Sequence, residues 1–88
     1  MTTAVDEVVA LLHDVTGDTT AEIGPATRLD GDLLLDSLEL AALAHRLQER
    51  HERVDLLAYV AGLDLEQIIA LTVDDVAGLV TASLVAAS

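Results

Sequence analysis

The sequence contains no cysteine, no lysine, no phenylalanine and no tryptophan. Without cysteine, the chain can form neither disulfides nor zinc–thiolate sites, and it has no thiol nucleophile of its own. Its one aromatic residue is Tyr59 and its one proline is Pro25, yet 52% of its residues are hydrophobic. We therefore expect a small helical bundle with an aliphatic core in which Tyr59 is packed.

Basic charge is also scarce, because sixteen acidic residues face only four arginines and the net charge is −12. Such a chain repels nucleic acids and anionic membranes, so we expect partners that carry basic patches instead. The N-terminal residues have neither the basic region nor the long apolar run of a signal peptide or a membrane span. We expect one domain over residues 1–88, monomeric and cytoplasmic.

Signals for the start of a helix recur along the chain, each a capping residue followed three positions later by an acid or glutamine. The pairs are Thr3–Asp6, Asp36–Glu39, Asp64–Gln67 and Thr72–Asp75. Gly17 is placed to end the first helix. Residues 54–63 are apolar and predict an additional short helix that Asp55 opens and Gly62 closes. The apolar stripe expected on the last helix comprises Val73, Val76, Ala77, Val80 and Leu84.

A long connection, residues 18–36, joins the first two predicted helices. Loops of this length are uncommon inside compact domains and are often functional. Its apolar residues, which we expect to pack against the bundle, are Ile23, Leu29, Leu33 and Leu35. The three aspartates of the segment, Asp30, Asp32 and Asp36, do not make a calcium loop, because leucines stand where the EF-hand pattern needs an oxygen ligand and a glycine. We predict no metal site.

Ser37 follows the predicted helix cap Asp36 and has three possible roles. A nucleophilic serine needs a base within hydrogen-bond reach, but His45 and His51 lie about 12 Å and 21 Å further along the same helix. No G-x-S-x-G elbow is present, so a serine hydrolase is disfavoured. Ser37 is therefore either an ordinary residue of the first helical turn or an attachment point for an anionic group, which a helix N-terminus favours.

The sequence Asp36-Ser37-Leu38 resembles the Asp-Ser-Leu signature of acyl carrier proteins. The predicted order of helices and loops is similar to that family's bundle over nearly the whole chain. This resemblance implies an all-α four-helix fold with a long first loop, here with a possible extra short helix between the second and third helices. It further implies that a separate phosphopantetheinyl transferase attaches 4′-phosphopantetheine from coenzyme A to Ser37, with Asp36 as the motif residue that caps the helix.

The same resemblance implies a non-catalytic, free-standing carrier that holds thioesters on the thiol of the attached arm. Its other partners are then the enzymes that load and process acyl or aminoacyl groups. Two alternatives stay open. The chain could be an unmodified acidic helical module for protein–protein interaction, or a carrier of primary fatty acid synthesis.

Two features depart from the carriers of fatty acid synthesis. Leu34 stands where the family often has glycine, and we expect the loop to take a different course there instead of a positive φ. The outward face of the second helix is less acidic than in those carriers, which favours polyketide or nonribosomal peptide biosynthesis. The residues expected on this partner surface are Leu38, Glu39, Ala42, His45, Arg46 and Glu49.

Overall fold

Five helices make up the fold over residues 3–17 and 22–87, the part of the chain that the computed structural model describes. They are α1 (Ala4–Thr16), α2 (Ser37–Arg50), α3 (Leu56–Ala61), α4 (Leu65–Ala70) and α5 (Val73–Ala87). The expected all-α fold is confirmed, and α3 is the extra short helix between the second helix and the one expected as third. Residues 18–21 of the expected first loop lie outside the described residues.

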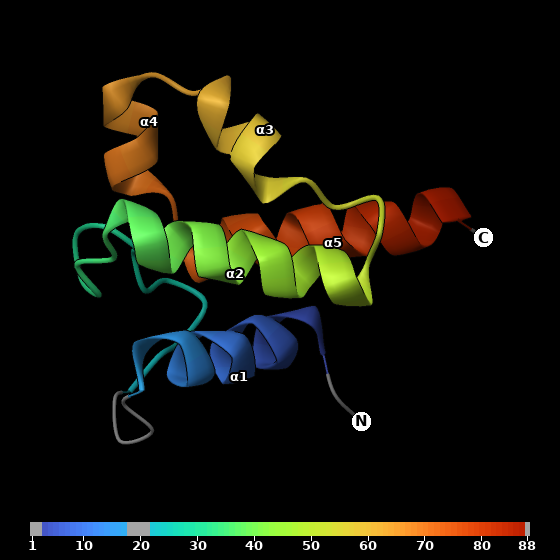
Figure 1. Cartoon of the computed structure of the whole chain (residues 1–88), viewed down its shortest axis with the longest axis horizontal. Helices are drawn as coiled ribbons and strands as arrows, with labels where there is room; N and C mark the ends of the chain where they lie inside the picture. The colour runs from blue at the N-terminus through green and yellow to red at the C-terminus, as the bar shows by residue number, and fades with distance from the viewer. Residues whose placement is uncertain (1–2, 18–21, 88) are drawn as a thin grey trace.

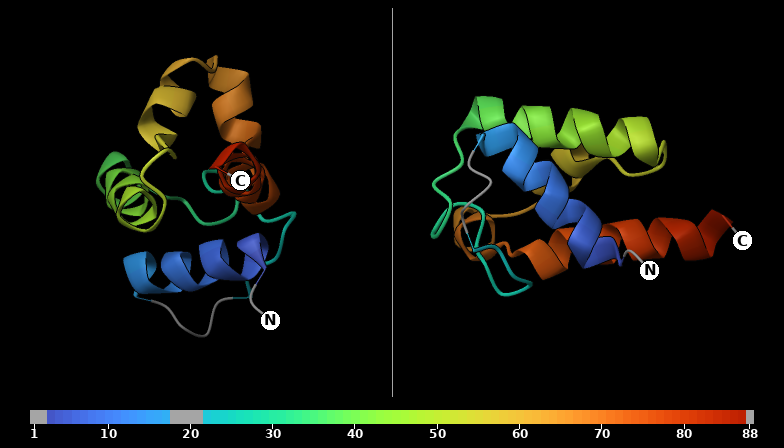
Figure 2. Two further views of the ribbon diagram at one scale, coloured as in Figure 1. Left: turned by 90° about the vertical axis from the view of Figure 1, so that its right-hand side faces the viewer. Right: turned by 90° about the horizontal axis from the view of Figure 1, so that it is seen from below.

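The three long helices α1, α2 and α5 form the body of the bundle (Figure 1). α1 packs against both α5 and α2, and α3 packs against α2. Seen along the bundle, α3 and α4 lie on the side away from α1, where they bridge from α2 to α5 (Figure 2). The largest fully buried side chains, all aliphatic, are Val8, Leu12, Leu43, Leu47, Leu56, Val73, Val76 and Val80.

The predicted helix starts are confirmed by hydrogen bonds between residues three apart in the chain. The Thr3 hydroxyl accepts a hydrogen bond from the Asp6 amide at 3.1 Å, and the Asp6 carboxylate accepts one from the Thr3 amide at 3.3 Å. The Asp64–Gln67 and Thr72–Asp75 pairs make the same reciprocal contacts. These bonds satisfy amide groups that have no partner inside the helix.

The loop before α2 is fastened to the start of α5 by backbone hydrogen bonds. The Leu29 amide donates to the Leu71 carbonyl at 3.0 Å, and the Val73 amide donates to the Thr27 carbonyl at 2.9 Å. Leu29 is buried in the core. The expectation that this loop packs against the bundle is therefore correct for the residues from 22 onward.

A side-chain contact closes the tip of the same loop. The Asp32 carboxylate accepts a hydrogen bond from the Arg28 amide at 2.8 Å and lies 3.5 Å from the Arg28 Nε. The backbone hydrogen bond first, and then the guanidinium, hold the pKa of Asp32 below its ordinary value. Both groups favour the charged carboxylate, so the turn is stabilised by the ionised form of Asp32.

Two expectations about packing are wrong. Tyr59 is exposed instead of packed in the core, because the six-residue α3 contacts the bundle through Leu56 and Val60, one turn apart. Leu84 is 54% exposed, because the last turns of α5 extend beyond α1 and α2 (Figure 1). No helix within residues 3–17 and 22–87 is both long enough and apolar enough to cross a membrane.

Candidate functional site

The start of α2 is fixed by a reciprocal pair of side-chain caps on either side of Ser37. The Asp36 carboxylate accepts a hydrogen bond from the Glu39 amide at 2.7 Å, while the Glu39 carboxylate accepts one from the Asp36 amide at 3.4 Å. Asp36 has extended backbone angles, and its carbonyl accepts the first helical hydrogen bond, from the Leu40 amide at 3.0 Å. Ser37 is thereby held as the first residue of the helix.

Replacing Asp36 tests this cap directly. We expect Asp36→Ala to lower the free energy of unfolding by about 0.5–2 kcal/mol, because the Glu39 amide loses its acceptor. Asp36→Asn should change it by only a few tenths of a kcal/mol, because asparagine caps helices as well as aspartate does. Urea denaturation followed by circular dichroism measures both values. Equal stability of the alanine and asparagine variants would show that the side-chain cap does not stabilise the helix.

The Ser37 side chain is exposed, and its hydroxyl has no hydrogen-bond partner among the described residues. Two of the three histidines are engaged elsewhere: His45 lies 3.2 Å from Glu49, one turn along α2, and His51 lies 2.7 Å from Glu7 of α1, while the third, His13, belongs to α1. Since the Ser37 hydroxyl has no hydrogen-bond partner within residues 3–17 and 22–87, no base in this part of the chain is placed to take its proton as in a catalytic triad. The geometry presents an accessible hydroxyl to an enzyme that comes from outside.

The residues expected on the partner surface of α2 differ in how far they are exposed and in what they contact. Leu38 is 79% exposed and His45 and Glu49 also face solvent, whereas Ala42 is half-buried. Glu39 is engaged in the helix cap. Arg46 differs from the rest because its guanidinium pairs with Asp14 of α1. Arg46 therefore joins the two helices, and no feature of the sequence connects these residues, which are 32 positions apart.

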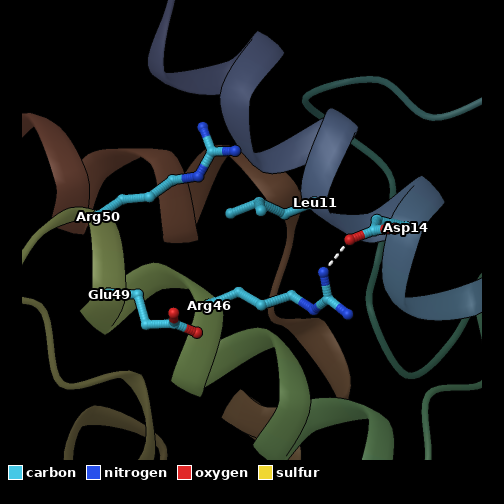
Figure 3. Close-up of a pocket in the computed structure, with 5 residues that line it drawn as sticks. All are labelled: Leu11, Asp14, Arg46, Glu49 and Arg50. Atoms are coloured by element: carbon cyan, nitrogen blue, oxygen red, sulfur yellow. Dashed lines mark hydrogen bonds and ion pairs between the residues drawn. The ribbon is translucent and has the colours of Figure 1, made fainter.

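Arg46 and Asp14 also line a hollow beside α2. This cleft, of about 360 Å³, lies between α1 and α2. Figure 3 shows Leu11 between the two arginine side chains, with Arg46 pointing to Asp14. The five residues that line the cleft are Leu11, Asp14, Arg46, Glu49 and Arg50. Since two arginines face two carboxylates, the cleft has no net charge with which to select an ionic ligand.

A second hollow is apolar and is lined in part by α2 close to Ser37. It is a recess of about 60 Å³ where the first loop, α2, α3 and α4 meet. Its lining residues are Leu29, Asp30, Leu35, Leu40, Val60, Ile68 and Leu71. An apolar cavity that holds one benzene molecule measures about 150 Å³. The recess as it stands therefore accommodates a group of a few atoms, and not an extended acyl chain.

The backbone of the loop beside Ser37 differs from the conformation that the sequence predicted. Leu34 has a φ of 54°, so it adopts the left-handed conformation that we expected the loop to avoid. The Leu34 amide donates to the Asp30 carbonyl at 3.1 Å, and the Leu35 amide donates to the Leu29 carbonyl at 3.1 Å. These bonds close the turn in front of Asp36, and the leucine takes the positive φ that the turn requires.

Comparison with known families decides the assignment. The family model described as a phosphopantetheine attachment site matches residues 6–86. The chain belongs to this family. The resemblance to acyl carrier proteins is thereby confirmed, whereas no curated protein and no solved structure gave a match.

Members of the phosphopantetheine attachment family carry a covalently attached 4′-phosphopantetheine. The start of α2 fits such a group. The amides of Ser37 and Leu38 have no acceptor among the described residues, and free amides at a helix N-terminus are suited to a phosphate. Within the described ranges, no three histidine or acidic side chains are grouped so that they could hold a metal ion.

Proposed function

We propose that Ser37 is the residue to which 4′-phosphopantetheine is attached, and that the chain carries acyl or aminoacyl groups on this arm. The observation that supports this proposal best is the exposed, unbonded Ser37 hydroxyl at the first position of a capped helix. The sequence has three serines. Of the other two, Ser83 is half-buried within α5 and Ser88 lies outside the described residues.

Ser37 supplies the oxygen in the modification reaction. Its Oγ forms a bond to the phosphorus next to pantetheine in coenzyme A, while the bond from that phosphorus to the nucleotide phosphate breaks. The proton of the hydroxyl leaves to a base on the transferase, since no described residue of this chain accepts it. The product is a phosphodiester next to the amides of Ser37 and Leu38, where the helix N-terminus stabilises its negative charge.

Intact-mass spectrometry tests this function. The folded chain is incubated with coenzyme A, magnesium and a broad-specificity phosphopantetheinyl transferase, and the modified peptide is then sequenced by fragmentation. We expect a gain of one phosphopantetheine on the peptide that contains Ser37. A folded chain that gains no mass would instead be an unmodified interaction module with the fold of a carrier.

We further propose that the carrier serves polyketide or nonribosomal peptide assembly, and not primary fatty acid synthesis. Three observations support this assignment. The apolar recess near Ser37 is too small for a long acyl chain, and the partner surface on α2 has Ala42 and His45 where fatty acid carriers are acidic. Three of the four arginines also lie between residues 46 and 53.

Arg46 provides a test of partner recognition by this surface. We expect Arg46→Glu to slow acyl or aminoacyl loading by the cognate enzyme, because the charge presented to that enzyme is reversed. Both partners of the Arg46–Asp14 pair are partly exposed, so its loss should cost less than about 1 kcal/mol of stability. The matched control is Asp14→Ala, which removes the ion pair and leaves Arg46 in place. Equal slowing in both variants would assign the effect to the contact between α1 and α2, and unchanged rates in both would exclude Arg46 from recognition.

A further inference from the structure

Leu34 adopts a backbone conformation that disfavours leucine. At a φ of 54°, the Cβ of an L-residue comes too close to the backbone, whereas glycine occupies this region freely. The conformation is imposed by the hydrogen bonds of the turn, in which the Leu33, Leu34 and Leu35 amides donate to carbonyls of residues 28–30 at 3.1 Å. A leucine at this position therefore makes the native state less stable than a glycine would.

The Leu34 side chain does not offset this strain by packing. It is 77% exposed, while its neighbours Leu33 and Leu35 are partly buried against the core. A single exposed leucine is ordinary on a protein surface. An exposed leucine held in a strained conformation is different, because the fold gains neither burial nor backbone stability from it. The side chain is thus available for a contact outside this chain.

Leu34 lies within the surface that an enzyme acting on Ser37 must cover. Three residues of chain span at most about 11 Å, so the Leu34 Cα lies within that distance of the Ser37 Cα. A standard interface buries about 800 Å² on each partner, which corresponds to a disc about 16 Å in radius. An enzyme centred on the Ser37 hydroxyl therefore covers Leu34 together with Leu38, which is 79% exposed on the other side of Ser37.

We propose that Leu34 is a specificity-determining residue that inserts into an apolar pocket of the phosphopantetheinyl transferase. The inference rests on the proposed attachment at Ser37. The transferase is the appropriate occupant because it must bring its active site into bonding distance of the Ser37 oxygen, whereas later enzymes reach the end of an arm. Asp30, Asp32 and Asp36 are exposed and lie within four residues of Leu34 along the chain, and Asp32 pairs with Arg28. The net charge of these groups is negative, so the pocket that receives Leu34 has a basic rim.

Two substitutions separate the side chain from the strain. Leu34→Ala removes most of the side chain but keeps the Cβ, and therefore the strain, at positive φ. Leu34→Gly removes the side chain and the strain together. The matched control is Leu84→Ala, at the end of α5 opposite to the start of α2 (Figure 1). The rate of phosphopantetheine transfer from coenzyme A is measured against carrier concentration with a broad-specificity transferase. Thermal unfolding of each apo variant is recorded in parallel.

We expect both Leu34 variants to lose at least about tenfold in kcat/KM, which is the effect of removing one buried aliphatic side chain from an interface. The loss should appear in KM and not in kcat. Leu84→Ala should keep the wild-type kinetics, and the midpoint of thermal unfolding should rise for Leu34→Gly alone.

Wild-type values of kcat/KM in both Leu34 variants, with a wild-type chain that is modified at Ser37, would overturn this inference and leave the proposed function standing. An equal loss of kcat/KM in Leu84→Ala would also overturn this inference, since the loss would then not be specific to position 34. A folded wild-type chain that the transferase does not modify would overturn the proposed function, and this inference with it.

Discussion

Ser37→Ala is expected to abolish the attachment of phosphopantetheine without altering the fold. The substitution removes the oxygen that forms the phosphodiester. It breaks no hydrogen bond of the described residues, and position 37 is exposed. A surface substitution of this kind changes the free energy of unfolding by less than about 0.5 kcal/mol. Intact-mass spectrometry after treatment with coenzyme A and transferase should show the unmodified mass alone, with an unchanged circular dichroism spectrum.

Ser83→Ala is the matched control for this result. Ser83 carries the same hydroxyl within α5, where it is half-buried, and its removal should leave the mass gain intact. A Ser37→Ala variant that still gained one phosphopantetheine would move the attachment to another residue, which fragmentation of the modified peptide would identify. Loss of the gain in both variants would indicate that the transferase responds to a change in the fold.

Leu56→Ala is expected to have the largest effect on stability of the substitutions considered. Leu56 is fully buried and is the one buried residue of α3. Truncation of a buried leucine to alanine costs about 2–5 kcal/mol. A domain of 88 residues has a total stability of about 4–13 kcal/mol. The substitution should therefore remove a large part of the stability, and it should release α3 from α2 first, because α3 has no other buried anchor.

The adjacent residue supplies the control for Leu56. Leu57 is 47% exposed, so Leu57→Ala should cost less than about 1 kcal/mol, since much of its side chain is in water in the native state. Urea unfolding of the two variants measures the difference. Equal costs would mean that α3 does not pack through Leu56. A local loss of α3 would also open the recess that Val60 helps to line, which couples this helix to the surroundings of Ser37.

The helix boundaries were predictable from the sequence because their signals are local. Asp36 and Glu39 satisfy each other's amides across three residues, and no distant part of the chain is needed to form that contact. The additional helix α3 was predictable for the same reason, from Asp55 at its start and Gly62 at its end. The serine that we propose as the attachment residue stood out because it follows one of these caps.

Features that depend on distant segments were not predictable. The first loop takes a course that depends on backbone bonds between Leu29 and Leu71 and between Thr27 and Val73. The positive φ of Leu34 within this loop is imposed by local turn bonds, but a leucine gives no sequence signal for it, because positive φ is expected of glycine. The pairing of Arg46 with Asp14 depends on how α1 lies against α2, which helical periodicity does not specify. The size of the apolar recess likewise follows from the distances between four segments, although the short helix that contributes Val60 to it was predicted.

The bonds between the first loop and the start of α5 have a consequence for the order of events during synthesis. A ribosome produces Ser37 well before Thr72 and Val73, and chains generally fold as their N-terminal parts emerge. The carbonyls of Pro25 and Thr27, however, obtain their amide partners only when Asp74 and Val73 have been made. The nascent chain therefore gives the proposed attachment serine its folded setting only after the last helix has begun.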